Sequence, residues 1–287
     1  MSSLLIGTIS PARRLRNRVA ITSIWLSVLI AAIPLAFVVI YLVQKGAGVI
    51  SWDFLTDDIP ISSRLPGPGM GPAVLGTLMI AGAATAMAVP LGVLAAVYLN
   101  EYGGKGRLAS VIRFLSDVMA GVPSIVMGLF IYTVWVLRYG QTGFAGALAL
   151  ACLMLPIVIR SAETALKLVP TDLREASAAL GARTSRTILT VVIPAALPGI
   201  VSGALLAVAR AAGETAPLLF TVGTVTEANR RLFEGTNTAL SAQIFGNARQ
   251  PFEAAIDRAW GAALTLIVLV FVLTAVARLV ARRFTVR

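Results

Sequence analysis

The chain has 287 residues, of which 57% are apolar and only 13% are charged, and its mean hydropathy is +0.87. Because soluble domains carry roughly a quarter of charged residues, this composition indicates an integral membrane protein. The sequence has no histidine and a single cysteine, Cys152. These counts exclude intrachain disulfides, thiolate metal cages, His-dependent zinc proteases and Ser-His or Cys-His hydrolases. We attribute the net charge of +11 to the basic inner loops of polytopic proteins rather than to nucleic-acid binding.

The first predicted span runs from Val19 to Val43, directly after an arginine-rich segment. Basic flanks stay on the inner side of the membrane, so residues 1–18 are expected to form a cytoplasmic tail. The apolar run is longer than a signal-peptide core and contains a proline, so no cleavable signal is predicted. Residues 44–72 contain acidic residues and a Gly/Pro cluster, which favours an outer loop with turns.

The second predicted span runs from Ala73 to Leu99, and a polar turn then returns the chain to the inner side. Asp117 follows that turn and is expected to cap or anchor the inner end of the third span. Helix breaks at membrane depth are tolerated where the freed backbone faces protein or a cavity. The third span is therefore predicted as a loosened helix that begins near Val118 and contains Gly121, Pro123 and Gly128.

The remaining spans are predicted at 144–159, at 191–222 and at 259–281, and a basic tail follows at 282–287. The polar segment 223–257 would be an outer loop whose LSAQIF stretch lies on the surface. Most of the 24 Lys and Arg residues fall in segments that this scheme places inside. The sequence thus predicts an all-α polytopic membrane protein with six transmembrane helices and both termini cytoplasmic.

The largest inner loop contains a pattern typical of a short capped helix. Asp172 and Glu175 are spaced as in a capping box, and the helix they begin is predicted to run through Leu180 and to end at Gly181. Thr and Ser at 184–185 would cap a second helix that continues into the fifth span. Any force on the short helix would therefore reach a membrane span directly.

Two ionisable residues, Arg210 and Glu214, lie four apart in the fifth span and can pair on one helix face. Each charge costs about 3 kcal/mol in a span on insertion scales, so we favour a site on a translocation path over a pair that only docks helices. The arginine fork suits phosphate or carboxylate. The adjacent carboxylate suits a substrate that still carries a proton, as monohydrogen phosphate does and sulfate does not. Glu214→Gln is then expected to weaken the discrimination between phosphate and sulfate.

Arg160, at the inner end of the fourth span, has two interpretations. It either lines an inner vestibule with Glu163 as its local partner, or extends to lipid headgroups. Gly199 and Gly203 have the GxxxG spacing that is typical of close helix packing. The sequence contains no GxxxxGK[ST] phosphate loop. We therefore expect no ATP hydrolysis, no catalytic residue and no bound cofactor or metal in this chain.

The inner loop resembles the EAA loop of ABC-importer membrane subunits in its residues Glu175, Ala176, Ser177 and Gly181, followed at the expected distance by VVIP. The segments DVMAGVPSIVMGLF, LPIVIRSAETAL and ARAAGETAPLLFT are similar to the PstA family of phosphate-importer permeases. The resemblance implies a type I ABC importer permease fold. Its five-helix core would occupy 73–281, with the coupling loop at about 161–190, after a first helix and outer loop at 19–72.

The same resemblance implies a subunit of an ATP-driven inorganic phosphate importer in a bacterial or archaeal plasma membrane. The implied partners are a homologous permease (PstC), an ATPase dimer that binds ATP and Mg (PstB), a phosphate-binding protein (PstS) and membrane lipid. The segment from Glu175 to Gly181 would dock on the ATPase. The implied substrate path holds Arg160, Arg210, Glu214 and Thr215.

Other interpretations remain open from the residues alone. The same machine could carry molybdate, sulfate or an amino acid, since a separate binding protein sets most of the selectivity. A passive anion channel or a sensor scaffold would need no ATPase-docking loop. A membrane enzyme is disfavoured because histidine is absent and no acidic pair has catalytic spacing. Glu175 also has a purely local interpretation as part of the capping box.

Overall fold

The computed structural model describes residues 11–67, 69–104 and 106–283 of the chain. Lys105, the first ten residues of the predicted N-terminal tail and residues 284–287 of the predicted C-terminal tail lie outside these ranges. The described ranges are helical with connecting loops, which confirms the predicted all-α class. Five helices are long and apolar enough to cross a membrane, or six if one bent pair is a single span.

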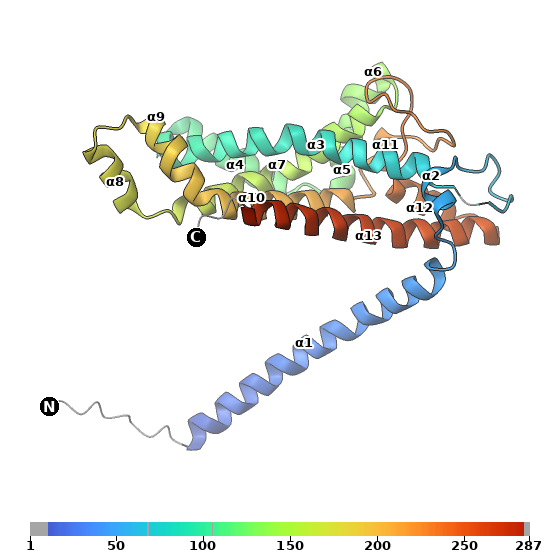
Figure 1. The fold of residues 1–287 in the computed structure, drawn as a ribbon, viewed down its shortest axis with the longest axis horizontal. Helices are drawn as coiled ribbons and strands as arrows, with labels where there is room; N and C mark the ends of the chain where they lie inside the picture. The colour runs from blue at the N-terminus through green and yellow to red at the C-terminus, as the bar shows by residue number, and fades with distance from the viewer. Residues whose placement is uncertain (1–10, 68, 105, 284–287) are drawn as a thin grey trace.

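The long helices form a bundle with two distinct ends (Figure 1). The inner end carries the short helices α8 (Thr171–Ala179) and α9 (Thr184–Thr187), close to the last described turn of α13 (Glu253–Arg283). The outer end carries α2 (Trp52–Thr56), α11 (Leu218–Thr221) and α12 (Leu240–Ala248). The names inner and outer follow the topology that the sequence predicts.

The first helix, α1 (Pro11–Gly46), leaves the bundle at an angle and contacts α13 near the outer end (Figure 1). It is longer than the predicted span because the arginine-rich segment before Val19 is itself helical. Only 6% of its most apolar window is buried. A Cβ on Gly46 would lie 2.8 Å from the Trp260 carbonyl oxygen, so the close contact with α13 requires glycine at this position.

The centre of the bundle is the pair α3 (Gly71–Val97) and α7 (Gly143–Lys167). Small side chains such as Ala88 and Ala151 are buried between them, which lets the two helix backbones approach closely. The predicted second span therefore corresponds to α3 and the π-helical turn η1 (Tyr98–Tyr102) that continues it. Helix α7 does not end at Ile159 as predicted but continues to Lys167.

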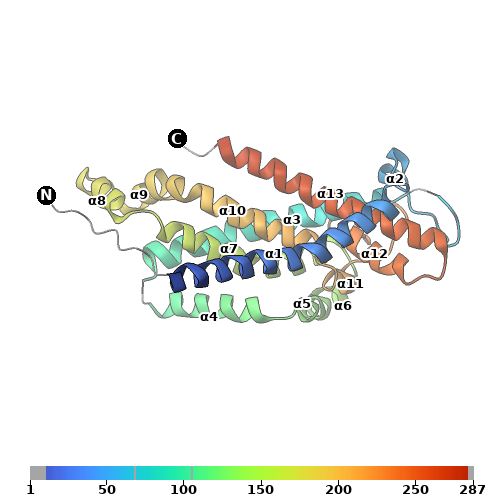
Figure 2. The same cartoon turned by 90° about the horizontal axis from the view of Figure 1, so that it is seen from below.

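The third span is not one loosened helix, which corrects the prediction. It is α4 (Arg107–Gly121) and α5 (Ser124–Ile131), bent by 106° at the break between them. The cause is Pro123, which lacks an N–H and forces the preceding Val122 into an extended conformation with ψ 127°. Figure 2 shows α4 along one side of the bundle, with α5 turning out of its line. The chain then continues through the π-helical turn η2 (Tyr132–Val136) and α6 (Leu137–Tyr139).

The fifth span also ends earlier than predicted. The π-helical turn η3 (Ile188–Val192) leads into α10 (Ile193–Ala212), which stops at Gly213. A turn then leads through Pro217 into α11. Gly199 and Gly203 pack against α7, because Cβ atoms there would lie 2.6 and 2.0 Å from side-chain atoms of Ala165 and Ser161. The predicted helix packing at this GxxxG pair is confirmed.

Three local predictions are wrong. The capping box does not form, because Pro170 occupies the N-cap of α8 and no side chain caps the helix; Arg183 is the N-cap of α9, again without a side-chain cap. Asp172 instead lies in the first turn of α8, where a carboxylate is favoured by the helix dipole. The LSAQIF stretch begins α12 and is largely buried rather than on the surface. The predicted end of α8 is confirmed by Gly181 at φ +77°.

Candidate functional site

Two arginines from different helices line one pocket between α4, α7 and α10. The pocket has a volume of about 590 Å³ and contains Arg160 of α7 and Arg210 of α10. Its other lining residues are small or apolar, apart from the hydroxyl side chains of Ser161 and Thr164. Arginine forks match the geometry of oxyanions, so the pocket suits an anion held from two sides.

The partner of Arg160 is Asp117 of α4 rather than the predicted Glu163. One Nη of Arg160 lies 2.5 Å from an Oδ of Asp117, and both side chains are exposed. Glu163 instead accepts from Arg113 of α4 at 3.1 Å and from Lys167 at 2.8 Å. Asp117 is inside α4 and caps no helix end. It connects α4 to α7 through Arg160, one of the two arginines that line the pocket.

Arg210 and Glu214 form the predicted pair, although Glu214 follows the end of α10. The Nε of Arg210 lies 3.6 Å from the nearer carboxylate oxygen of Glu214, and Arg210 is the more exposed of the two. The Glu214 carbonyl accepts from the Ser241 hydroxyl at 3.0 Å, which ties this turn to α12. Glu214 and the half-buried Thr215 are not among the residues that line the two-arginine pocket.

The EAA-like residues lie on an exposed helix at the inner end. Glu175 and Ala176 are exposed, and Ser177 is half-buried with its hydroxyl 2.8 Å from that of Thr187. Helix α8 stands clear of the long helices at the tip of the bundle (Figure 1). Its outward surface is therefore free to contact another protein, and the Ser177–Thr187 contact holds it against the segment that leads into α10.

Sequence reasoning missed the residue next to Glu175. The guanidinium of Arg174 contacts both carboxylate oxygens of Glu101, at 2.9 and 3.4 Å. The two residues are 73 positions apart, so no local spacing rule reveals the pair. The available signals were a lone acidic residue in the turn after the second span and an arginine beside the EAA-like glutamate.

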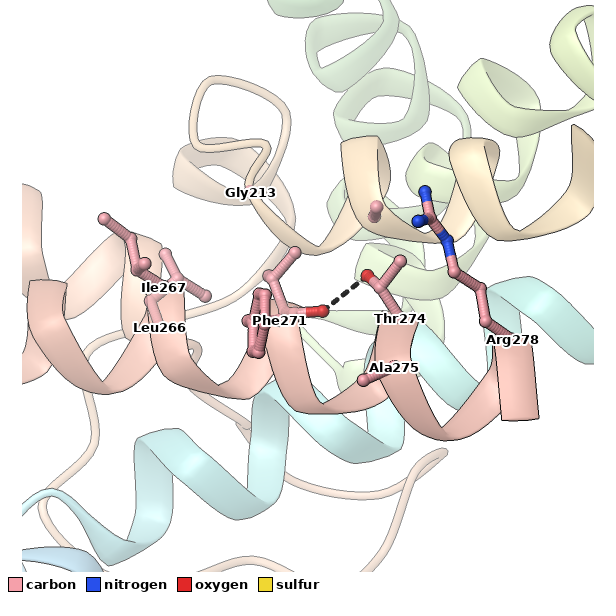
Figure 3. Close-up of a pocket in the computed structure, with 9 residues that line it drawn as sticks. Gly213, Leu266, Ile267, Phe271, Thr274, Ala275 and Arg278 are labelled. Carbon is pink, nitrogen blue, oxygen red and sulfur yellow. Dashed lines mark hydrogen bonds between the residues drawn. The ribbon is translucent and has the colours of Figure 1, made fainter. Parts of the chain in front are cut away.

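A second groove, of about 700 Å³, lies between α10 and α13. Figure 3 shows apolar side chains of α13 such as Phe271 along it and Arg278 reaching from one end toward α10. The Thr274 hydroxyl donates to the Val270 carbonyl within α13. With one charged lining residue, this groove is a poorer anion site than the two-arginine pocket.

Residues 88–286 match the family model described as the binding-protein-dependent transport system inner membrane component. The chain belongs to this family. Among curated relatives of this permease, the phosphate transport system permease protein PstA 1 of Mycobacterium tuberculosis is 44% identical over 90% of the chain and 86% of the relative. PstA of Haemophilus influenzae is 40% identical over 90% of the chain and 91% of the relative.

Solved transporters share the fold of this permease at low sequence identity. A chain of a bacterial alginate ABC transporter in complex with its alginate-bound periplasmic protein has a TM-score of 0.68 at 15% identity, covering 94% of this permease and 96% of that chain. A chain of the inward-facing methionine ABC transporter MetNI has a TM-score of 0.64 at 20% identity, covering 76% and 96%. The fold is therefore that of type I ABC importer permeases.

Proposed function

We propose that this permease is the transmembrane subunit of an ATP-driven importer of inorganic phosphate and forms half of its translocation path. The observation that carries the proposal is the single pocket that Arg160 of α7 and Arg210 of α10 both line. The PstA names of the relatives support phosphate as the substrate. Phosphate offers several oxygens to two guanidinium forks, and each charge-assisted hydrogen bond is stronger than a neutral one.

The two carboxylates beside the arginines act as counter-ions when the path is empty. Asp117 pairs with Arg160 and Glu214 with Arg210, so neither guanidinium stands uncompensated in the membrane. Arriving phosphate displaces these carboxylates, and their return favours its release. This exchange keeps binding weak enough for transport. Glu214 also accepts a hydrogen bond from the hydroxyl of monohydrogen phosphate, which sulfate cannot donate.

The partner chains follow from the same proposal. A homologous permease of the PstC type completes the path, and a phosphate-binding protein of the PstS type delivers the substrate from outside. A PstB-type ATPase dimer, with its ATP and Mg, docks on α8 through Glu175, Ala176, Ser177 and Gly181. The complex lies in the plasma (inner) membrane with both termini of this permease cytoplasmic, and this chain itself has no enzymatic activity.

Uptake of labelled phosphate and labelled sulfate by vesicles that hold the whole complex tests the proposal. Arg210→Ala is expected to leave assembly intact and to abolish phosphate uptake, and Arg160→Ala to reduce it strongly. Arg16→Ala is the matched control, because Arg16 is an exposed arginine in the first turns of α1. Normal uptake by the Arg210→Ala complex would leave the pair only a helix-packing role.

Two further results separate the alternatives. Phosphate flux that needs no ATP would favour a passive channel, and preferred uptake of another anion would change the substrate. Glu214→Gln is expected to narrow the preference for phosphate over sulfate. Unchanged selectivity in an active Glu214→Gln complex would refute the role of Glu214 as the acceptor of this hydrogen bond.

A further inference from the structure

Helix α8 is attached to the bundle by a side chain as well as by its own chain. Along the chain it leads through α9 and η3 into α10. Through Arg174 it is also held at the end of α7, because the guanidinium donates to the Val169 carbonyl at 2.7 Å and to the Leu166 carbonyl at 3.0 Å. The same guanidinium holds both oxygens of Glu101, which belongs to the turn η1 at the end of α3.

This contact is the least exposed ion pair within the described ranges, with the side chain of Glu101 8% exposed and that of Arg174 23% exposed. A two-pronged arginine–carboxylate contact fixes orientation as well as distance. Removing either partner would leave the other charge largely buried without its counter-ion, which is strongly unfavourable. The pair is therefore a stiff joint between α8 and the turn η1.

The turn η1 is held from its other side by α4. Arg113 of α4 donates to the Leu99 carbonyl at 3.0 Å and to the Gly104 carbonyl at 3.4 Å. About one helical turn beyond Arg113, α4 carries Asp117, the partner of Arg160 in the two-arginine pocket. A continuous set of contacts therefore connects α8 through η1 and α4 to the carboxylate that occupies one of the pocket arginines.

We propose that Arg174 is a positioning residue that transmits the movement of α8 to α4, so that ATPase motion shifts Asp117 relative to Arg160. This route is separate from the chain connection that leads from α8 into α10. The inference rests on the proposed function, since it takes α8 as the surface on which the ATPase docks. Movement of α8 then reaches the two pocket arginines along different paths, Arg210 through α10 and Arg160 through α4.

The test measures ATP hydrolysis and phosphate uptake in the same vesicles with the complete importer. Arg174→Gln and Glu101→Gln are each expected to retain ATP hydrolysis while phosphate transported per ATP falls about tenfold or more. Arg174→Lys, which keeps the charge but loses the fork, is expected to recover part of the ratio. Arg107→Gln is the control, because Arg107 is an exposed arginine at the start of α4 and its ratio should not change.

A second readout distinguishes transmission from mere loss of structure. In the wild-type complex, hydrogen exchange of residues 107–121 is expected to change when ATP binds, and in both glutamine variants this response is lost while residues 188–212 still respond. A response of 107–121 that survives in the variants, or an unchanged transport-to-ATP ratio, overturns the inference. If neither glutamine variant assembles, an unchanged ratio in Arg174→Lys overturns it. Failure of the wild-type complex to couple ATP to phosphate uptake would instead refute the proposed function.

Discussion

At the outer end of the bundle the loops are held by amides, hydroxyls and backbone carbonyls, whereas at the inner end the helices are held by ion pairs. The buried Asn237 shows the outer pattern: its Oδ1 accepts from the Gly143 N–H at 2.8 Å, and its Nδ2 donates to the Asn229 carbonyl at 2.9 Å. The inner pattern is shown by Glu163, which holds Arg113 of α4 and Lys167 of its own helix.

An arginine at each end shows the same difference. Arg258 at the outer end is 2% exposed and donates to the carbonyls of Ser63 and Leu65 at 3.0 and 2.7 Å. Arg174 at the inner end adds a carboxylate, Glu101, to its carbonyl partners. Hydrogen bonds to backbone carbonyls fix one geometry and are costly to leave unmade. Ion pairs can instead exchange one anion for another, which suits the end at which we propose that the ATPase docks and phosphate is released.

The largest effect is expected from a methyl group at the outer end. A Cβ on Gly76 would lie 1.9 Å from the Thr238 carbonyl oxygen, and a backbone atom cannot move aside as a flexible side chain can. Gly76→Ala should therefore destabilise the protein by about 3 kcal/mol or more, measured as thermal unfolding in detergent. Gly82→Ala on the same helix is the control, since nothing lies within 4 Å of its Cβ position. Equal unfolding temperatures for Gly76→Ala and Gly82→Ala would contradict the close contact at Gly76.

A smaller effect is expected for Asn237→Ala. The substitution leaves the Gly143 N–H without its acceptor in a buried environment, which costs roughly 1–3 kcal/mol. Because no charge is involved, the loss in unfolding temperature should be the same in low and high salt. A loss that disappears in high salt would show that the outer end depends on charges after all.

At the inner end, Glu163→Gln is expected to loosen α4. Its cationic partners are exposed side chains, so solvent screening limits the loss to below about 1 kcal/mol. Hydrogen exchange of residues 107–121 should speed up in low salt and differ less from wild type in high salt, while 237–248 should exchange as before. Faster hydrogen exchange in both 107–121 and 237–248 would mean that the stability of one end depends on the other.

The smallest effect is expected from an exposed ion pair at the outer end. Arg231 and Glu234 are 2.6 Å apart but both are largely exposed, and such pairs contribute little. Arg231→Gln should leave the unfolding temperature unchanged within measurement error. A clear drop in the unfolding temperature would mean that ion pairs stabilise both ends. The two ends would then differ only in how deeply their ion pairs are buried.

Features that depend on nearby residues could be predicted from the sequence. The apolar spans follow from hydropathy over single segments, and the contact of Arg210 with Glu214 follows from their four-residue spacing. The end of α8 at Gly181 follows from the left-handed conformation that glycine adopts readily. The family resemblance likewise rested on short continuous motifs.

Features that depend on partners far away in the chain could not be predicted. Asp117 and Arg160 are 43 positions apart, and only the packing of α4 on α7 brings them together. Hydropathy does not record direction, so the sequence predicts a loosened helix at Pro123 and not the 106° bend, although the proline itself indicates a break. The capping box is absent for a local reason. Pro170 is the N-cap of α8, the position predicted for Asp172, and Asp172 therefore lies inside the first turn.

The contact of α1 with α13 bears on how the protein is made. Helix α1 precedes the other described candidate spans in the chain and has the highest mean hydropathy among them, 2.8, so it can partition into the bilayer by itself. Its contact with the bundle, where Gly46 and Tyr41 meet Trp260, is made to α13, which follows all the other described spans in the chain. The two helices therefore join only after the spans between them have been synthesised, and α1 must wait in lipid until then.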